Sequence, residues 1–362
     1  MNNRVVVFRV DASLEMGTGH LMRCLTLANA LQAQGRECHF ICREHPGNLI
    51  DYLRQQGHKV YPLTYVRGGQ PDDSPAHAPW LGGTQAQDAA FCTNILADLQ
   101  PEWLVVDHYA LDTRWEQQLK PYYHRLLVID DLADRPHQCD VLLDQTLGRD
   151  PQDYQPWVPA DCTVLCGAHY ALLRPEFAAL RPYSLQRREL APLRHILVSM
   201  GGVDKENATG QILAALATAE LPAGSLITAV MGATSPWLEV IQQQAARLSV
   251  PTLVRSGVSD MAQLMADSDL AIGAAGATSW ERCCLGLPSI MVVLAVNQQQ
   301  VAEGLQAVHA VKVLAGPQDI PEELPTLAGE LLFQPHRVHH MSKAAAGVTD
   351  GMGTARLLGY LE

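Results

Sequence analysis

The stretch that decides the fold is RVVVFRVDASLEMGTGHLMRCLTLANALQAQG, residues 4–35. Residues 4–10 contain the apolar run VVVF and are typical of a buried parallel strand. A loop containing Gly17 and Gly19 follows, and residues 20–34 then carry apolar side chains at helical spacing until a glycine ends the pattern. A strand, a glycine-containing turn and a helix make the first half of a βαβ unit, so this stretch predicts an α/β fold.

The same alternation continues in two blocks along the chain. Apolar runs that end in polar residues predict further strands at 37–43, 103–109, 125–131 and 141–145, and again at 195–202, 225–232, 251–257, 269–276 and 289–295. We therefore expect two Rossmann-like lobes with parallel sheets, whose ligands lie at the carboxyl ends of the strands.

The boundaries between these blocks follow from breaks in the pattern. Residues 174–193 contain three prolines and a charge cluster and are the expected linker, while residues 67–88 have the glycine, proline and aspartate content of a long loop. We expect an N-terminal lobe over 1–182, a C-terminal lobe over 183–345, and a helical C-terminal tail over 346–362.

Bulk composition excludes several classes of function. The chain has 362 residues, 48% hydrophobic and 18% charged, with a formal net charge of −12 and no basic tract. Nucleic acid is therefore not an expected partner, because binding it requires clustered positive charge. No apolar run approaches the ~18 residues of a membrane span, so no membrane partner is expected, and we expect a cytoplasmic, monomeric protein.

The cysteines and histidines show no metal-site pattern. Nine cysteines are scattered without a paired CxxC array, and we expect them to be reduced, buried side chains. We expect no metal and no cofactor. A small anionic ligand stays compatible with the acidic chain, because helix N-termini and loop amides bind phosphate.

His20 is the first candidate for chemistry. At a helix N-terminus the dipole disfavours the imidazolium form, so His20 would be a neutral base, with Asp11 close enough in sequence to orient the ring. The alternative is a packing residue that makes a backbone hydrogen bond. A dinucleotide site is disfavoured, because Met22 occupies the third glycine position of GxGxxG.

Three other strand ends offer polar groups. Gly201 and Gly202 follow the strand at 195–202 and serve either turn geometry or backbone approach to a ligand. In the loop 273–288, small residues leave room for a diphosphate, with a ribose-binding carboxylate at Glu281; the alternative is a capping box, Thr278-x-x-Glu281, that needs no ligand. The remaining strand end carries three polar side chains, Asp107, His108 and Tyr109.

Together these loops resemble one family. The stretches RVDASLEMGTGHLMRCLTLANAL, VVDHYALD, GAHYALLRPEF, SMGGVD and GAAGATSWERCCLGLP are similar to the PseG family, the UDP-2,4-diacetamido-2,4,6-trideoxy-β-L-altropyranose hydrolases of pseudaminic acid biosynthesis. The resemblance implies a GT-B architecture with the UDP-sugar in an interdomain cleft. It also implies hydrolysis without metal or cofactor, in a pathway that serves flagellin glycosylation.

The resemblance also implies roles for particular residues. The counterpart of His20 acts on a water, Tyr109 and Asn297 lie at the sugar end, and the loop after the second lobe's fourth strand holds the UDP. The proposed attack, by a water held near Asp11 and Tyr109, inverts the anomeric carbon. The residues expected to contact substrate or UDP are Gly17, Gly19, Gly201, Gly202, Gly276, Ala277, Thr278, Ser279, Glu281 and Asn297.

Two other readings remain open from the sequence. One is a UDP-sugar glycosyltransferase of the same fold, similar to the lipid II transferase MurG, which also has a glycine-rich loop and a histidine near its N-terminus. The other is a non-catalytic nucleotide-sugar-binding protein that kept the pocket. Release of sugar without an acceptor would distinguish the hydrolase from both.

Overall fold

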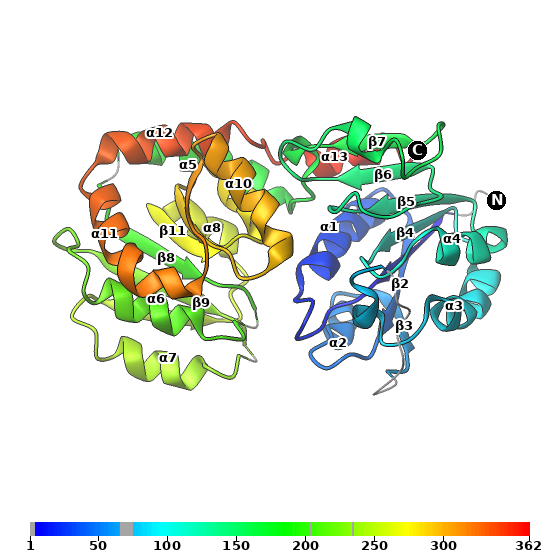
Figure 1. The fold of residues 1–362 in the computed structure, drawn as a ribbon, viewed down its shortest axis with the longest axis horizontal. Coiled ribbons are helices and arrows are strands. Elements are labelled where there is room, and N and C mark those ends of the chain that lie inside the picture. Colours follow the sequence, from blue (N-terminus) through cyan, green and yellow to red (C-terminus); the bar gives the residue numbers. More distant parts are fainter. Residues whose placement is uncertain (1–3, 66–74, 191, 203, 234) are drawn as a thin grey trace. The chain divides into compact units, whose positions relative to one another are not determined.

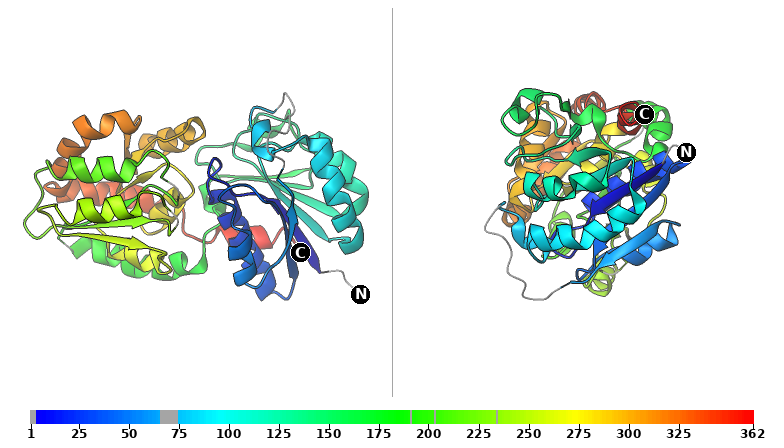
Figure 2. Two further views of the ribbon diagram at one scale, coloured as in Figure 1. Left: turned by 90° about the horizontal axis from the view of Figure 1, so that it is seen from below. Right: turned by 90° about the vertical axis from the view of Figure 1, so that its right-hand side faces the viewer.

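The computed structural model describes residues 4–65, 75–190, 192–202, 204–233 and 235–362 (Figures 1 and 2). The chain forms two compact units, Met1–Leu172 with Gly353–Glu362, and Leu173–Met352. The N-terminal unit therefore ends at Leu172, where the sequence suggested 182, and the last ten residues return to it. We call the two units the N-terminal and the C-terminal unit.

The N-terminal unit is built on a seven-stranded sheet. Its strands run in the order β3-β2-β1-β4-β5-β6-β7, and every neighbouring pair is parallel. This is the Rossmann order, in which the chain reverses direction across the sheet between β1 and β4. The strands are β1 (Val5–Val10), β2 (Glu37–Arg43), β3 (Lys59–Leu63), β4 (Trp103–Asp107), β5 (Arg125–Ile129), β6 (Val141–Asp144) and β7 (Thr163–Cys166).

Helices cover both faces of this sheet. Along β1, Val6, Phe8 and Val10 pack in one core with α1, whereas Val7 packs on the opposite face, in the core that holds residues of α3 and α4. Because both faces of the strand are buried, its sequence is apolar on both faces rather than alternating, apart from the buried Arg9, which pairs with Asp11 and Asp88. The helices of this unit are α1 (Gly19–Ala33), α2 (Ile50–Gln55), α3 (Gln85–Leu99), α4 (Thr113–Leu119) and α13 (Gly353–Leu358), with the 3₁₀ turns η1 (Ala78–Leu81), η2 (Lys120–Tyr122), η3 (Pro151–Tyr154) and η4 (Ala168–Tyr170).

The C-terminal segment completes the N-terminal unit. Leu357 and Leu361 are buried in the same core as α1. The carbonyl of Leu361 accepts hydrogen bonds from Arg36 Nη2 at 2.6 Å and from Trp103 Nε1 at 3.1 Å. Residues 353–362 are thus part of a core, which corrects the expectation of a separate tail over 346–362; residues 346–352 belong to the C-terminal unit.

The C-terminal unit repeats the same design with six strands. Their order is β10-β9-β8-β11-β12-β13, again the Rossmann order and parallel throughout. The reversal point here lies between β8 and β11. The strands are β8 (His195–Ser199), β9 (Leu226–Met231), β10 (Thr252–Ser256), β11 (Leu270–Ala274), β12 (Ser289–Val292) and β13 (Val311–Leu314).

Eight helices belong to the described part of this unit. They are α5 (Pro175–Leu190), α6 (Ala208–Leu216), α7 (Leu238–Ala245), α8 (Met261–Asp267), α9 (Thr278–Cys284), α10 (Gln299–Ala307), α11 (Ile320–Leu332) and α12 (Pro335–Ala346), with the 3₁₀ turns η5 (Val296–Gln298) and η6 (Pro317–Asp319). Helices α6 and α11 share one core with the sheet, and α5 packs against α8, α9 and α12.

The segment expected as a linker is the helix α5. Two of its arginines donate hydrogen bonds to backbone carbonyls at the ends of neighbouring elements, and Arg187 pairs with Asp269. Arg181 bonds to the carbonyls of Cys284, Thr349 and Ala346, and Arg188 to those of Leu285, Ser268 and Met265. A proline-containing, charged segment reads as a linker in sequence, yet here its charges serve as caps for other elements.

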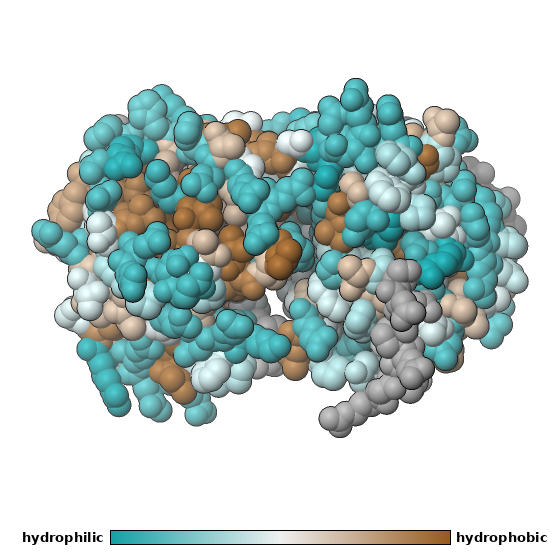
Figure 3. Space-filling view, in the orientation of Figure 1, coloured by the Kyte–Doolittle hydropathy of each residue, from teal (hydrophilic) through white to brown (hydrophobic). Residues whose placement is uncertain are grey.

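The face of the molecule drawn in Figure 3 is mostly polar, with apolar areas between the polar side chains. Teal, hydrophilic residues dominate the face drawn in Figure 3. Exposed large apolar side chains in the N-terminal unit come from different elements: Leu14, Tyr52, Phe91 and Tyr360. In the described part of the chain, no helix is both long and apolar enough to span a membrane.

Candidate active site

The loop between β1 and α1 presents His20 at the start of a helix. Gly17 has φ of +75°, which favours glycine, and its backbone pairs with Ser13 through bonds of 2.9 and 3.3 Å. This small turn ends at Thr18, the N-cap of α1, which makes no side-chain capping bond. His20 is therefore the second helical residue, and its half-buried side chain is 13% exposed.

The partner of His20 is Asp107, the last residue of β4. The Nδ1 atom of His20 lies 2.6 Å from Asp107 Oδ1. A carboxylate can only accept, so Nδ1 carries the ring proton and Nε2 keeps its lone pair. In the uncharged form of the ring, Nε2 can therefore take a proton from water.

Asp107 is held ionised by its surroundings. Arg23, one turn along α1, donates to both of its oxygens at 2.7 and 2.8 Å. Burial would raise the pKa of the Asp107 carboxyl, but the charge of Arg23 and the hydrogen bonds from Arg23 and His20 outweigh it and lower that pKa below its usual range. The side chain is fully buried.

Tyr109 lies against the histidine ring without bonding to it. The two ring centroids are 4.5 Å apart and the planes cross at 79°. The Tyr109 hydroxyl donates to Asp131 Oδ2 at 2.7 Å, and Arg23 donates to the same oxygen at 2.6 Å. Burial and the charge of Asp131 raise the pKa of Tyr109 well above its usual value, so the phenol stays protonated.

The expectation that Asp11 orients His20 is wrong. The Asp11 side chain is fully buried, 2.7 Å from Arg9 Nη1, and its Oδ1 accepts the backbone N–H of Arg43 at 2.6 Å. Although burial opposes ionisation, the charge of Arg9 and bonds from His108 and His45 lower the pKa of Asp11 well below its usual value. Asp11 therefore braces β1 against β2 and is not placed to hold a catalytic water.

A buried ionic network surrounds Asp11. Arg9 and Arg43 both pair with Asp88 at 2.7 Å. The backbone N–H of Ala110 donates to Nδ1 of His108, which places the ring proton on Nε2, 3.2 Å from Asp11 Oδ2. These contacts tie the ends of β1, β2 and β4 to α3 behind the candidate base.

The second group of expected residues lies at the reversal point of the C-terminal unit. Gly201 and Gly202 follow β8 and are exposed, and Gly201 has φ of +96°. A side chain at Gly232, after β9, would collide with the carbonyl oxygen of Gly202. Both turn geometry and close packing therefore contribute to the glycine content of these loops.

The capping box that the sequence offered as the alternative at the start of α9 is not formed. Ala277 is the N-cap residue, without a side-chain bond, and Thr278 is already helical. Ser279 instead donates from Oγ to the carbonyl of Gly276 at 2.6 Å, and the buried Arg282 bonds to the Ala274 carbonyl at 2.8 Å. The loop is held from inside by these two side chains, so Ser279 supports the loop rather than presenting its hydroxyl outward.

Glu281 and Asn297 differ in environment. Glu281 is half-buried, with Arg174 at 3.8 Å, and burial raises the pKa of its carboxyl to about 7 against the opposing charges of Arg174 and Arg282. Asn297 lies in the exposed turn η5 after β12. The structure thus places His20 beside the reversal point of the first sheet, and residues 201–202 and 276–281 beside that of the second sheet. Asn297 instead follows β12, one strand further along.

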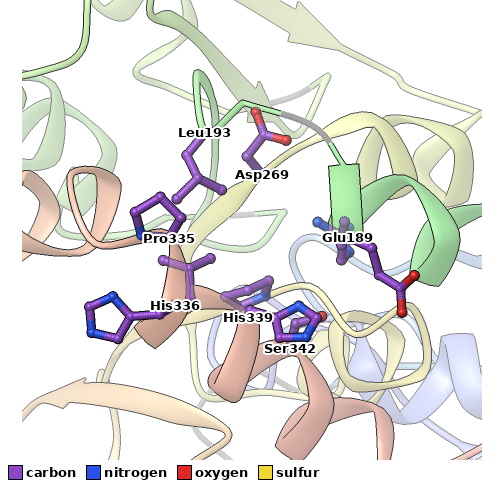
Figure 4. Close-up of a pocket in the computed structure, with 10 residues that line it drawn as sticks. Glu189, Leu193, Asp269, Pro335, His336, His339 and Ser342 are labelled. Atoms are coloured by element: carbon purple, nitrogen blue, oxygen red, sulfur yellow. The ribbon is translucent and has the colours of Figure 1, made fainter.

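A cavity in the C-terminal unit lies apart from the candidate residues of that unit. Its volume is about 430 Å³, and its lining includes Leu193, Asp269 and Pro288, which precede β8, β11 and β12 (Figure 4). It therefore opens at the amino ends of the strands, opposite the ends where ligands of such sheets bind. None of the residues expected from the sequence lines it.

The described residues form neither a metal site nor a disulfide. Within the described ranges, no group of three or more His, Cys, Asp or Glu residues is arranged to hold a metal ion. The nine cysteines are free thiols, and all except the half-buried Cys162 are buried.

Two parallel sheets in Rossmann order, each with polar loops at its reversal point, define the GT-B class of protein. The comparisons agree with this class. Residues 200–353 match the Glycosyltransferase family 28 C-terminal domain. The solved structure of MurG from Acinetobacter baumannii superposes with a TM-score of 0.69 over 99% of both chains at 17% identity. The rhamnosyltransferase SpnG bound to thymidine diphosphate gives 0.60 at 17% identity, covering 98% of this chain and all of that one (100%).

Sequence comparison confirms the resemblance to the PseG family. The chain is 28% identical over 240 residues to the UDP-2,4-diacetamido-2,4,6-trideoxy-β-L-altropyranose hydrolase of Campylobacter jejuni, covering 66% of this chain and 74% of that protein. It is also 26% identical over 214 residues to the spore coat polysaccharide biosynthesis protein SpsG of Bacillus subtilis, covering 57% of this chain and 60% of that one. The chain is thus a GT-B protein related to PseG.

Proposed function

We propose that this protein hydrolyses a UDP-linked diacetamido-trideoxy sugar at the anomeric carbon–oxygen bond. The products are UDP and 2,4-diacetamido-2,4,6-trideoxy-L-altrose, a precursor for pseudaminic acid. The relationship to the C. jejuni hydrolase supports the substrate class. The single observation that carries the reaction type is the His20–Asp107 pair, with Nδ1 and Oδ1 2.6 Å apart.

The pair supports general-base chemistry on water. Asp107 fixes the ring proton on Nδ1, and the lone pair of Nε2 removes a proton from the attacking water. The water oxygen bonds to C1 while the bond from C1 to the β-phosphate oxygen breaks, and its electron pair leaves with UDP. Attack opposite the leaving group inverts the anomeric configuration. No metal is needed in this scheme, because the histidine activates the nucleophile.

The other expected residues have supporting roles in the proposal. Tyr109 shapes the sugar end beside His20, and Gly17 and Gly19 leave clearance for sugar and water. In the C-terminal unit, the backbone around Gly201, Gly202 and the α9 start contacts the diphosphate, whose developing charge it stabilises. The groups assigned to UDP and the sugar there are Gly276, Ala277, Thr278, Glu281 and Asn297, with Ser279 acting through the loop.

The test combines a variant with isotope labelling. His20→Asn should keep UDP affinity while kcat falls about 10²–10⁴-fold, the usual contribution of a general base. His124→Asn, at an exposed histidine of the same unit, is the matched control and should leave kcat unchanged. In ¹⁸O-water the label should enter the sugar; label in UDP would overturn cleavage at carbon.

A second candidate function is sugar transfer by the same site. The family 28 domain match and the likeness to MurG favour considering it. A transferase would release little free sugar until an acceptor is added, whereas the hydrolase reaches full turnover in buffer alone. Chromatography of an acceptor-free reaction distinguishes the two.

A further inference from the structure

Two aromatic side chains beside His20 have no role in the chemistry described so far. The Trp80 ring lies 5.9 Å from the Tyr109 ring, nearly parallel at 24°, and 6.5 Å from His20. The His77 ring lies 4.6 Å from Trp80 and 5.3 Å from Tyr109. We call His77, Trp80 and Tyr109 the aromatic wall.

The wall is held in place by the core beneath it. Trp80 belongs to η1, whose Ala78 and Leu81 are buried, the latter in the core with residues of α3 and α4. The turn is closed by the bond from the Trp80 N–H to the His77 carbonyl at 2.9 Å. Trp80 itself is only half-buried, although an aromatic ring of its size gains most from full burial.

The aromatic wall is neutral and contains a buried polar atom that has no partner among the described residues. Burial lowers the pKa of His77, so its imidazole is uncharged at neutral pH. Its Nδ1 is buried and has no hydrogen-bond partner among the described residues. Native proteins seldom leave such an atom unpaired, and a bound ligand would satisfy it.

We propose that the aromatic wall is the sugar-specificity surface of this site, selecting hexoses that carry a methyl at C6 and acetamido substituents. This inference rests on the proposed function. A sugar presents C–H faces and methyl groups that pack on aromatic rings, and one amide N–H can reach His77 Nδ1. An apolar wall favours a C6 methyl over a hydroxymethyl group, whose hydroxyl would lose water without gaining a partner. Discrimination of this kind reaches roughly 10²-fold.

Trp80→Ala tests the wall, because the buried anchors Ala78 and Leu81 remain. We expect kcat/KM for the 6-deoxy substrate to fall about 10–100-fold, mainly because KM rises. The ratio of kcat/KM for the 6-deoxy substrate to kcat/KM for its 6-hydroxy analogue should approach one. Trp80→Phe should recover most of the selectivity. Phe91→Ala, at an exposed aromatic of α3, is the matched control and should change neither. If Trp80→Ala does not fold, Trp80→Leu replaces it in the same measurement.

A binding measurement separates this inference from the proposed function. In a His20→Asn background the substrate persists, so calorimetry can compare the affinity for UDP with that for the intact UDP-sugar. The affinity gained from the sugar should disappear with Trp80→Ala, while UDP affinity stays constant. If the wild type hydrolyses the substrate but Trp80→Ala leaves the affinity gained from the sugar unchanged, the role of the aromatic wall is wrong and the hydrolase proposal stands. If Trp80→Ala removes the affinity gained from the sugar but the wild type does not hydrolyse the substrate, the hydrolase proposal is wrong and the role of the aromatic wall stands.

Discussion

The Nδ1 of His20 and the Oδ1 of Asp107 lie 2.6 Å apart, although 87 positions separate the residues in the chain. The two residues meet because β1, which leads into the loop before His20, and β4, which ends at Asp107, are neighbours in the sheet. Val10, which precedes the loop to His20, is paired directly with Asp107, because β4 is the neighbour of β1 where the chain reverses. A base built at that point receives its orienting carboxylate from the adjacent strand end, and not from its own loop.

Asp107→Asn should abolish the base while leaving most of the site in place. The amide would donate to Nδ1, which moves the ring proton to Nε2 and removes the lone pair that accepts from water. We expect kcat to fall by about 10²–10⁴-fold with KM changed only a few-fold. Steady-state kinetics on material shown to be folded by near-ultraviolet dichroism provides the measurement.

The control for this variant is Asp98→Asn, an exposed aspartate on α3. It removes the same charge from the same unit and should leave kcat unchanged. Near-normal kcat in Asp107→Asn would show that another group sets the tautomer of His20 or that His20 is not the base.

Asp11→Asn should affect stability much more than catalysis. The substitution weakens a fully buried ion pair with Arg9, and such losses cost about 3–5 kcal/mol, reduced here because Asp88 still pairs with Arg9. We expect a lower free energy of unfolding in urea and a kcat per folded molecule within about tenfold of wild type. A large loss of kcat with an unchanged free energy of unfolding would show that Asp11 acts in catalysis after all.

The same variant has a defined pH dependence. The pKa of Asp11 is lowered in the folded state, so its stabilisation is complete above the unfolded pKa of about 4 and is lost as the pH falls through the lower, folded value. The stability difference between wild type and Asp11→Asn should therefore be constant from pH 5 to 8 and shrink in acid.

Glu281 should make UDP binding depend on pH near neutrality. Its folded pKa is raised to about 7 by burial, and only the carboxylate can accept two ribose hydroxyls. The dissociation constant for UDP should therefore fall as the pH rises from 6 to 8 and level off above. Glu281→Gln should bind more weakly at pH 8 and show only the shallow dependence that the ionisation of UDP itself contributes; equal slopes in both proteins would exclude this role.

Local sequence predicted much of the fold because its strands are buried on both faces. Apolar runs such as 37–43 coincide with the observed β2, Glu37–Arg43. The strands β3, β7 and β13 went unpredicted. Strands β3 and β13 are partly exposed and lack a continuous apolar run, and β7 has only four residues. The linker prediction at 174–193 failed because prolines and charges in sequence do not reveal that α5 uses its arginines to cap other elements.

The candidate site was predictable only in part, because its partners come from distant strands. His20 and Tyr109 follow from strand-end positions. Assigning Asp11 as the orienting group relied on nearness in sequence, whereas the Rossmann order would have placed Asp107 next to Val10. Trp80 had no signal at all, since it lies within the loop predicted over 67–88, of which residues 67–74 lie outside the described structure.

Gly276→Ala should separate ligand contact from folding in the α9 loop. A Cβ at Gly276 meets no atom within 4 Å, so the free protein should keep its thermal midpoint. If the diphosphate approaches this backbone, the added methyl should displace it and weaken UDP binding by about 10–100-fold, the value of a hydrogen bond to a charged group. Gly273→Ala is the informative contrast, because its Cβ would lie 2.9 Å from the Ser199 carbonyl and against Arg282, so it should destabilise the protein even without ligand. Calorimetry with UDP and thermal unfolding of both variants provide the comparison. Unchanged UDP affinity in a stable Gly276→Ala protein would move the diphosphate away from this loop, toward Gly201 and Gly202.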